Sequence, residues 1–106
     1  MSQKVRAILA ELRRQLEKLY DGRLEKIILF GSQARGDAEP DSDIDVMLVL
    51  RDPVELDVEL KRVTPVTAAL SLEHNVVIST IYMSERRYAT EQSPLLNSAR
   101  REGTAA

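Results

Sequence analysis

Residues 30–46 read FGSQARGDAEPDSDIDV, and they carry most of what this sequence reveals about fold and chemistry. The Gly31-Ser32 pair directly follows an apolar run, and the pattern Asp43-x-Asp45 begins after ten further residues. Because alternate side chains of a β-strand share a face, we expect Asp43 and Asp45 to point to the same side of a sheet, about 7 Å apart. Two carboxylates so placed repel each other unless a cation binds or one of them takes up a proton.

The acidic pair and the glycine turn together favour a site for a metal ion and phosphates. Mg²⁺ prefers oxygen ligands and is often held by one or two carboxylates together with substrate phosphates. Gly31 lets a backbone N–H approach a ligand closely, and the start of a helix supplies further N–H donors. Ser32 adds a hydroxyl that can also cap that helix. Taken alone, each of the two motifs also has an ordinary structural explanation. Asp43 and Asp45 could be acids on a solvated strand face, and Gly31-Ser32 an ordinary strand-to-helix turn.

Two similar motifs are excluded by single positions. The spacing from Gly31 to Gly36 matches a P-loop, but Asp37 stands where that loop needs Lys and would repel phosphates. The three aspartates at 41, 43 and 45 resemble the start of a calcium loop. That loop needs Gly at its sixth position, where Val46 stands, and a bidentate Glu at its end, where Asp52 stands.

Periodicity predicts the elements around this segment. In chain order we expect a helix over 3–20, a strand over 24–30, a short helical start, a strand over 44–50, a helix from 53 to about 73, a strand over 76–83, and two helices beginning at 85 and 94. Ser2 is expected to cap the first helix, and Asp52-Pro53 with Glu55 is a strong signal for the start of the long one. Pro65 should kink that helix.

The apolar positions predict which helix faces are buried. The first helix should bury Val5, Ile8, Leu9, Leu12, Leu16, Leu19 and Tyr20; the long helix should bury Leu56, Leu60, Val63 and Leu70. Tyr82 and Tyr88 are expected to pack against other side chains rather than to stack on a nucleotide, and His74 to lie at a helix end.

Alternating strands and helices predict an α/β (α+β) fold, a mixed sheet of about three to four strands with flanking helices, in a single domain over 1–106. The link between the first two strands is only about thirteen residues long and holds little helix. Since a parallel crossover needs more chain, these two strands are expected to be antiparallel.

Composition limits the function classes. The formal net charge is −2, whereas a domain that binds nucleic acid through its overall field is usually basic, so direct binding of nucleic acid is not expected. There are no cysteines and one histidine, which excludes thiolate zinc sites, multi-histidine sites and a cysteine nucleophile. Uncharged runs fall far short of the roughly 20 residues that span a bilayer, and we expect a cytoplasmic protein.

The pattern of Gly31-Ser32, ten further residues and then Asp43-x-Asp45 resembles the signature of the DNA polymerase β-like nucleotidyltransferase superfamily. The variant Gly-Ser-x-Ala-Arg-Gly with Ser-Asp-x-Asp is similar to its minimal nucleotidyltransferase group. The resemblance is specific over 30–50 and extends by element order to about residue 90. It implies a polymerase β palm-like fold and in-line attack on the α-phosphate of a nucleoside triphosphate, with release of pyrophosphate.

The resemblance also implies roles for single residues. Gly31 and Ser32 would hold the phosphates of the nucleotide, with ATP the expected substrate. Asp43 and Asp45 would be the catalytic carboxylates and hold one or two Mg²⁺ ions. Arg35 would either contact phosphate or brace the acidic loop.

One departure from the superfamily pattern concerns the third strand. The superfamily usually places there a third carboxylate, a metal ligand and general base, but this strand has no acid and offers Ser79. Glu73 lies just before the strand and is a poor substitute. Either a partner supplies the base, or activity is weak or lost.

Three functions are compatible with this pattern. The resemblance implies foremost a nucleotidyltransferase that adenylylates a HEPN-type ribonuclease toxin and acts as its antitoxin in a hetero-oligomer. The alternative is a binding module of the same fold that neutralises the toxin by contact alone. An antibiotic nucleotidyltransferase is disfavoured, since such enzymes usually carry an additional helical domain.

Overall fold

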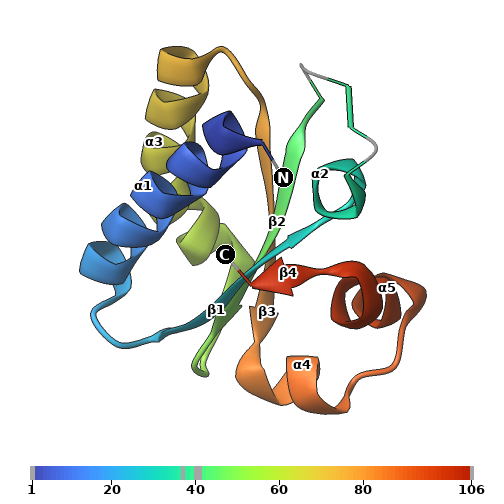
Figure 1. Ribbon diagram of the computed structural model, residues 1–106. Helices are drawn as coiled ribbons and strands as arrows, with labels where there is room; N and C mark the ends of the chain where they lie inside the picture. The colour runs from blue at the N-terminus through green and yellow to red at the C-terminus, as the bar shows by residue number, and fades with distance from the viewer. Residues whose placement is uncertain (1, 37, 40–41, 106) are drawn as a thin grey trace.

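The computed structural model describes residues 2–36, 38–39 and 42–105, and its elements alternate much as expected (Figure 1). In chain order they are α1 (Gln3–Tyr20), β1 (Leu24–Phe30), α2 (Ser32–Arg35), β2 (Ile44–Leu50), α3 (Leu56–His74), β3 (Ile78–Ser84), α4 (Glu85–Thr90), α5 (Pro94–Glu102) and β4 (Thr104–Ala105). The short strand β4 was not predicted, because two residues are too few to show an alternating pattern.

The strands form one mixed sheet in the order β3-β2-β1-β4. β1 is antiparallel to β2, as the short link between them predicted, and β2 is parallel to β3. β4 pairs antiparallel with β1 on its outer side. The prediction of a mixed sheet with flanking helices is therefore confirmed.

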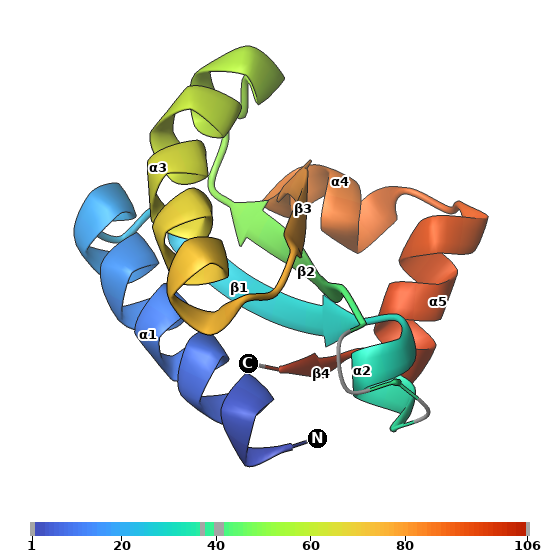
Figure 2. The ribbon, with the colours of Figure 1, turned by 90° about the horizontal axis from the view of Figure 1, so that it is seen from above.

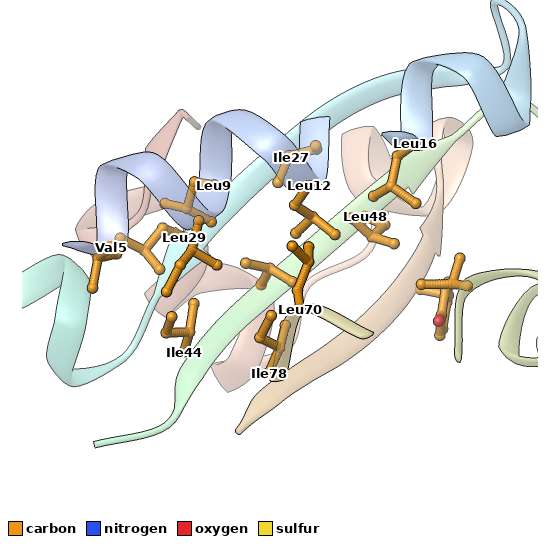
Figure 3. Packing of buried hydrophobic residues seen from close by; sticks show 14 of the residues in the cluster. Val5, Leu9, Leu12, Leu16, Ile27, Leu29, Ile44, Leu48, Leu70 and Ile78 are labelled. Atoms are coloured by element: carbon orange, nitrogen blue, oxygen red, sulfur yellow. The ribbon is translucent and has the colours of Figure 1, made fainter. Parts of the chain in front are cut away.

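Helices cover both faces of the sheet, which explains why β2 is apolar along most of its length (Figure 2). α1 and α3 lie on one face, where Leu12 and Leu16 pack among side chains of β1 and β2 (Figure 3). On the other face, Leu96 and Ala99 of α5 pack with buried residues of all three long strands. The two layers hold the end of β1 and the start of β2 in fixed register.

α1 begins and ends as predicted, with one error in its buried face. The Ser2 hydroxyl accepts a hydrogen bond from the Val5 N–H at 3.1 Å, and Asp21 ends the helix in the left-handed conformation. Leu19 was expected in the core but is 40% exposed. Tyr20 lies four residues after Leu16 and so continues the inward row, which turns Leu19 away from the sheet.

The predicted start of α3 at Asp52-Pro53 is wrong, because the helix begins at Leu56. The Pro53 carbonyl, which would accept an intrahelical hydrogen bond in a helix begun there, instead accepts one from Arg23 Nη2 at 2.6 Å. Arg23, just before β1, thus ties the Pro53 segment to the start of the sheet. α3 then continues unbroken through Pro65, where the expected kink stays a prediction.

The buried face of α3 also differs from the apolar pattern. Leu56 is 60% exposed and Leu60 is 41% exposed, whereas Glu59 is only 2% exposed. The Tyr20 hydroxyl donates to Glu59 Oε1 at 3.0 Å, and Arg23 Nη2 lies 3.4 Å from Glu59 Oε2. Burial, and then this carboxylate, raise the pKa of Tyr20. An ionic cluster therefore joins α3 to α1 where leucines were expected to do so.

The remaining aromatic and histidine predictions are confirmed. Tyr82 is buried, and Tyr88 packs against the core on the α5 side. His74 is the last residue of α3. Among the helices of the described residues, none combines the length and apolar character needed to cross a bilayer.

Candidate active site

Three chain segments that are distant in sequence meet where β1 ends and where β2 and β3 begin. Phe30, the last residue of β1, pairs with Asp45 of β2. On its other side, Asp45 pairs with Ser79 of β3. The turn after β1, the acidic start of β2 and Ser79 therefore form a row across one end of the sheet.

The two faces of β2 are divided as the alternation predicted. Ile44 and Val46 are buried among the residues that pack under α1 and α3. Met47, two residues along from Asp45, belongs to the core on the α5 side, so Asp45 lies on that opposite face. Asp43 lies one residue before β2 and is exposed, whereas Asp45 is partly buried.

The turn after β1 packs directly against the Asp45 carboxylate. Gly31 has φ of +76°, a conformation that side-chain-bearing residues rarely adopt. A Cβ placed on Gly31 would lie 2.7 Å from Asp45 Oδ2, closer than real Cβ contacts allow. Gly31 is therefore required for two reasons, its backbone conformation and the carboxylate beside it.

α2 presents its N-terminal end next to this contact. Gly31 is the N-cap and Ser32 is the first helical residue, so the predicted capping role of Ser32 is wrong. The hydrogen bonds of this turn begin with the N–H of Arg35 to the Gly31 carbonyl and of Gly36 to the Ser32 carbonyl. The N–H groups of residues 32–34 consequently have no acceptor within the helix, the usual state of a helix start.

Gln33 was not recognised in the sequence but helps to fix the site. It is 8% exposed, and its Nε2 donates to the Ser42 carbonyl at 3.2 Å, directly before Asp43. This bond fastens α2 to the strand that carries the carboxylates. A lone glutamine between two glycines has no distinctive pattern, so only the structure reveals it.

The structure also places Arg35, a further residue of the predicted motif. Arg35 is exposed at the end of α2 and makes a contact within the protein. The choice between a phosphate contact and a bracing role for Arg35 stays open. Asp37 and Asp41 lie outside the described residues.

The carboxylates of Asp43 and Asp45 suit a divalent cation whose other ligands come from the phosphates of a substrate. Burial, and then the charge of Asp43, raise the pKa of Asp45 above its ordinary value. A cation between the two carboxylates would relieve that repulsion. Within the described residues, no cluster of three or more His, Cys, Asp or Glu side chains could hold a metal. Two carboxylates plus substrate phosphates is a known arrangement for Mg²⁺.

Asp45→Asn is expected to raise the melting temperature at pH 7 without metal. Because the pKa of Asp45 is raised in the folded state, its charged form costs stability above that pKa, and the cost vanishes as the pH falls through it. The gain should therefore shrink toward pH 4, near the ordinary pKa of aspartate of about 3.9. Thermal melts across this range in EDTA test it, with the exposed loop variant Asp52→Asn as control. A gain that is the same at all pH values would contradict the account.

Gly31→Ala is expected to lower the free energy of unfolding by about 1–3 kcal/mol through its backbone alone. The contact with Asp45 Oδ2 should add to this loss. Gly36→Ala serves as a comparison for positive φ without a contact, because Gly36 has φ of +82° and nothing lies within 4 Å of its added Cβ. The backbone cost itself should be larger at Gly31, whose ψ of −156° lies in a region that only glycine commonly adopts, than at Gly36, whose ψ of 9° is in the left-handed helical region. Urea unfolding of both variants measures the difference. Equal losses would mean that the turn does not press on the carboxylate.

Known proteins resemble this chain in both sequence and fold. The family model described as "Nucleotidyltransferase domain" matches residues 9–95, most of the chain. The chain belongs to the nucleotidyltransferase domain family. The expected minimal nucleotidyltransferase is thereby confirmed at the level of the family. The match spans the Gly31 turn, both carboxylates and Ser79.

Two relatives of this nucleotidyltransferase domain come from Methanocaldococcus jannaschii, and each is named "Putative protein adenylyltransferase". One is 42% identical over 73 residues, which cover 69% of this chain and 67% of the relative. The other is 31% identical over 74 residues, which cover 70% of this chain and 74% of the relative.

Solved structures support the same fold. A structure described as a minimal nucleotidyltransferase has a TM-score of 0.58 at 24% identity, covering 93% of this chain and 92% of its own. A crystal structure described as a toxin–antitoxin with AMP-PNP has a TM-score of 0.62 at 17% identity, covering 89% of this chain and 68% of its own. These likenesses confirm the predicted nucleotidyltransferase fold.

Proposed function

We propose that this nucleotidyltransferase domain, a single domain over 1–106, moves AMP from ATP onto a partner protein in a reaction that needs Mg²⁺. The observation that carries the proposal is the contact of the Gly31 turn with the Asp45 carboxylate. In this proposal, the turn that would bind phosphate is next to the acid that would bind the metal. The names of the two curated relatives support a protein as the acceptor of the nucleotide.

The residues at the strand ends divide the work of binding. The Gly31 and Ser32 backbone, with the Ser32 hydroxyl, would hold the terminal phosphates of ATP at the start of α2. Asp43 and Asp45 would hold Mg²⁺, and Gln33 keeps the Asp43 segment in place. When bound, Mg²⁺ would neutralise the negative charge that develops on the transferred phosphate. Arg35 would contact phosphate or brace the acidic loop.

In the reaction, an acceptor oxygen forms a bond to the α-phosphorus while the bond to pyrophosphate breaks. The acceptor's proton must leave as this happens. Ser79 stands beside Asp45, where the superfamily pattern would supply a carboxylate to take it. A phenol is therefore a suitable acceptor, since its unperturbed pKa of about 10 makes it easier to ionise than an aliphatic alcohol.

We further propose that the acceptor is a HEPN-type ribonuclease toxin and that this protein acts in the cytoplasm as its antitoxin, in a hetero-oligomer with it. Support comes from a structural neighbour described as a toxin–antitoxin with AMP-PNP. The second candidate is neutralisation by contact alone. It is favoured by one observation, the absence of a carboxylate at Ser79.

Intact-mass spectrometry of a HEPN-type protein encoded beside this chain tests the proposal. After incubation with ATP and Mg²⁺, we expect the partner to gain the mass of one or more AMP units, and Asp43→Asn to prevent the gain. A partner that stays unmodified, yet is inhibited equally by wild type and Asp43→Asn, would establish the contact-only function instead.

A further inference from the structure

The outer edge of β1 is only partly covered by β4. β4 pairs with Ile28 and Leu29, and no residue that the structure describes pairs with the outer side of β1 from Leu24 to Ile27 (Figure 2). An edge of this kind presents backbone N–H and C=O groups that a further strand can bond. The chain that covers such an edge must be extended.

A cleft of about 320 Å³ lies at this open edge, beside the end of β4. Lys26 and Ile27 of β1, Tyr88 of α4, Arg100 of α5 and Ala105 of β4 all line it. The cleft therefore contains the edge of the strand together with side chains from the two helices on the α5 face. Its position continues the line that β4 takes along β1.

The side chains around the cleft give it positive charge. Lys26 Nζ lies 5.2 Å from the centre of the Tyr88 ring, and Arg100 Cζ lies 5.3 Å from it. Arg100 also donates to the backbone carbonyls of Tyr88 and Glu91. The nearby Glu91 carboxylate, which the charge of Arg100 reaches, is ion-paired with Arg87. Glu25 is the one acid that lines the cleft among the described residues, and it is paired with Arg51.

We propose that this cleft takes an extended acidic segment of the acceptor protein as an added strand along β1, an inference that rests on the proposed transfer to a protein. The peptide backbone would bond the open edge, as in strand addition to other sheets. Acidic side chains on alternate positions would meet Lys26 and Arg100. A small anion would use the two cations but leave the strand edge unused, so the edge favours a peptide.

The register connects this cleft to the candidate active site. Lys26, Ile28 and Phe30 alternate along β1 on one face, and Phe30 pairs with Asp45. Phe30 lies four positions after Lys26 along the strand, about 13 Å away. Because β4 covers the edge at Ile28 and Leu29, a segment docked at Lys26 would leave β1 there. It would hold the rest of its protein on the sheet face that carries Asp45 and so raise the local concentration of the acceptor group.

Binding of short peptides tests this proposal without a known partner. The probe is a peptide that alternates Thr and Glu, compared with one that alternates Thr and Lys and with a Thr-Glu peptide N-methylated at alternate residues. We expect the acidic peptide to shift the amide NMR signals of Leu24–Ile27. Lys26→Glu should weaken its binding by about fivefold to tenfold at low salt. Lys61→Glu, an exposed charge reversal on α3, should leave binding unchanged.

Several outcomes would overturn the strand-addition proposal. It would be contradicted if the N-methylated peptide bound as tightly as the unmodified one, or if Lys26→Glu bound the acidic peptide as tightly as the wild type. Shifts of amide NMR signals outside β1 would also contradict it. Displacement of the peptide by inorganic phosphate at equal concentration would indicate a simple anion site. Asp43→Asn separates this proposal from the proposed function, because that variant should bind the peptide normally while binding Mg²⁺–ATP more weakly. Peptide binding with no AMP transfer by the wild type would remove the catalytic proposal and keep the docking site.

Discussion

Leu16→Ala is expected to lower the free energy of unfolding by about 2–5 kcal/mol, the usual cost of emptying a fully buried leucine site. Leu16 is completely buried in the layer between α1 and the sheet (Figure 3). Its loss leaves a cavity that a helix fixed by β1 and α3 cannot easily close. Urea unfolding followed by circular dichroism measures the change.

Leu19→Ala is the matched control, on the same helix and with the same atoms removed. Leu19 is 40% exposed, so its loss is expected to stay within about 0.5 kcal/mol. Comparing the two variants tests the structure against the apolar sequence pattern, which predicted that both leucines lie in the core. A loss below about 0.5 kcal/mol for Leu16→Ala would mean that this face of α1 is not packed on the sheet.

Ser79→Asp is expected to speed AMP transfer by up to about 100-fold, the lower end of what a positioned general base contributes. Ser79 pairs directly with Asp45, so an aspartate there would stand beside the metal-binding pair. The same charge should lower the melting temperature without metal, because a third carboxylate adds repulsion, and Mg²⁺ should restore it. Initial rates of transfer and melts with and without Mg²⁺ give both quantities.

Ser79→Asn provides the control, since it has a similar shape without the charge. It should leave both the transfer rate and the effect of Mg²⁺ on melting near their wild-type values. An unchanged rate in Ser79→Asp, with Mg²⁺ still restoring its melting temperature, would mean that the acceptor protein already supplies the base.

The order and pairing of the elements could be predicted because local rules decide them. Helical spacing and the Ser2 cap define α1, and β-branched residues mark β3. A link of only thirteen residues between Phe30 and Ile44 forces the antiparallel pairing of β1 with β2. In each case the information lies within a few residues of the feature that it determines.

The errors arose where contacts between distant residues override the local pattern. Pro53 and Asp52 resemble a helix start, but Arg23, thirty residues away, takes the Pro53 carbonyl. Glu59 is buried because Tyr20 and Arg23 solvate its carboxylate, which turns Leu60 outward. Neither partner can be identified from the spacing of apolar residues.

The candidate site was predictable in its residue types and less so in its geometry. The motif identifies Gly31, Ser32, Asp43 and Asp45 as one group, and β1 and β2 bring the turn and Asp45 into contact. The sequence could not show that Gly31 has no room for a side chain beside Asp45. It could not show the bond from Gln33 either, because both depend on the register of two strands.

Calorimetric titration of Mg²⁺–ATP into the wild type and into Asp43→Asn/Asp45→Asn tests the central claim most directly. We expect the wild type to bind, and the double variant to bind at least about tenfold more weakly, since even the outer partners of metal ligands contribute that much. The double variant should melt at the same temperature or higher, because the burial of a charged carboxylate and its repulsion by Asp43, which together raise the pKa of Asp45, are both gone. Unchanged Mg²⁺–ATP affinity in a folded double variant would contradict the assignment of the site.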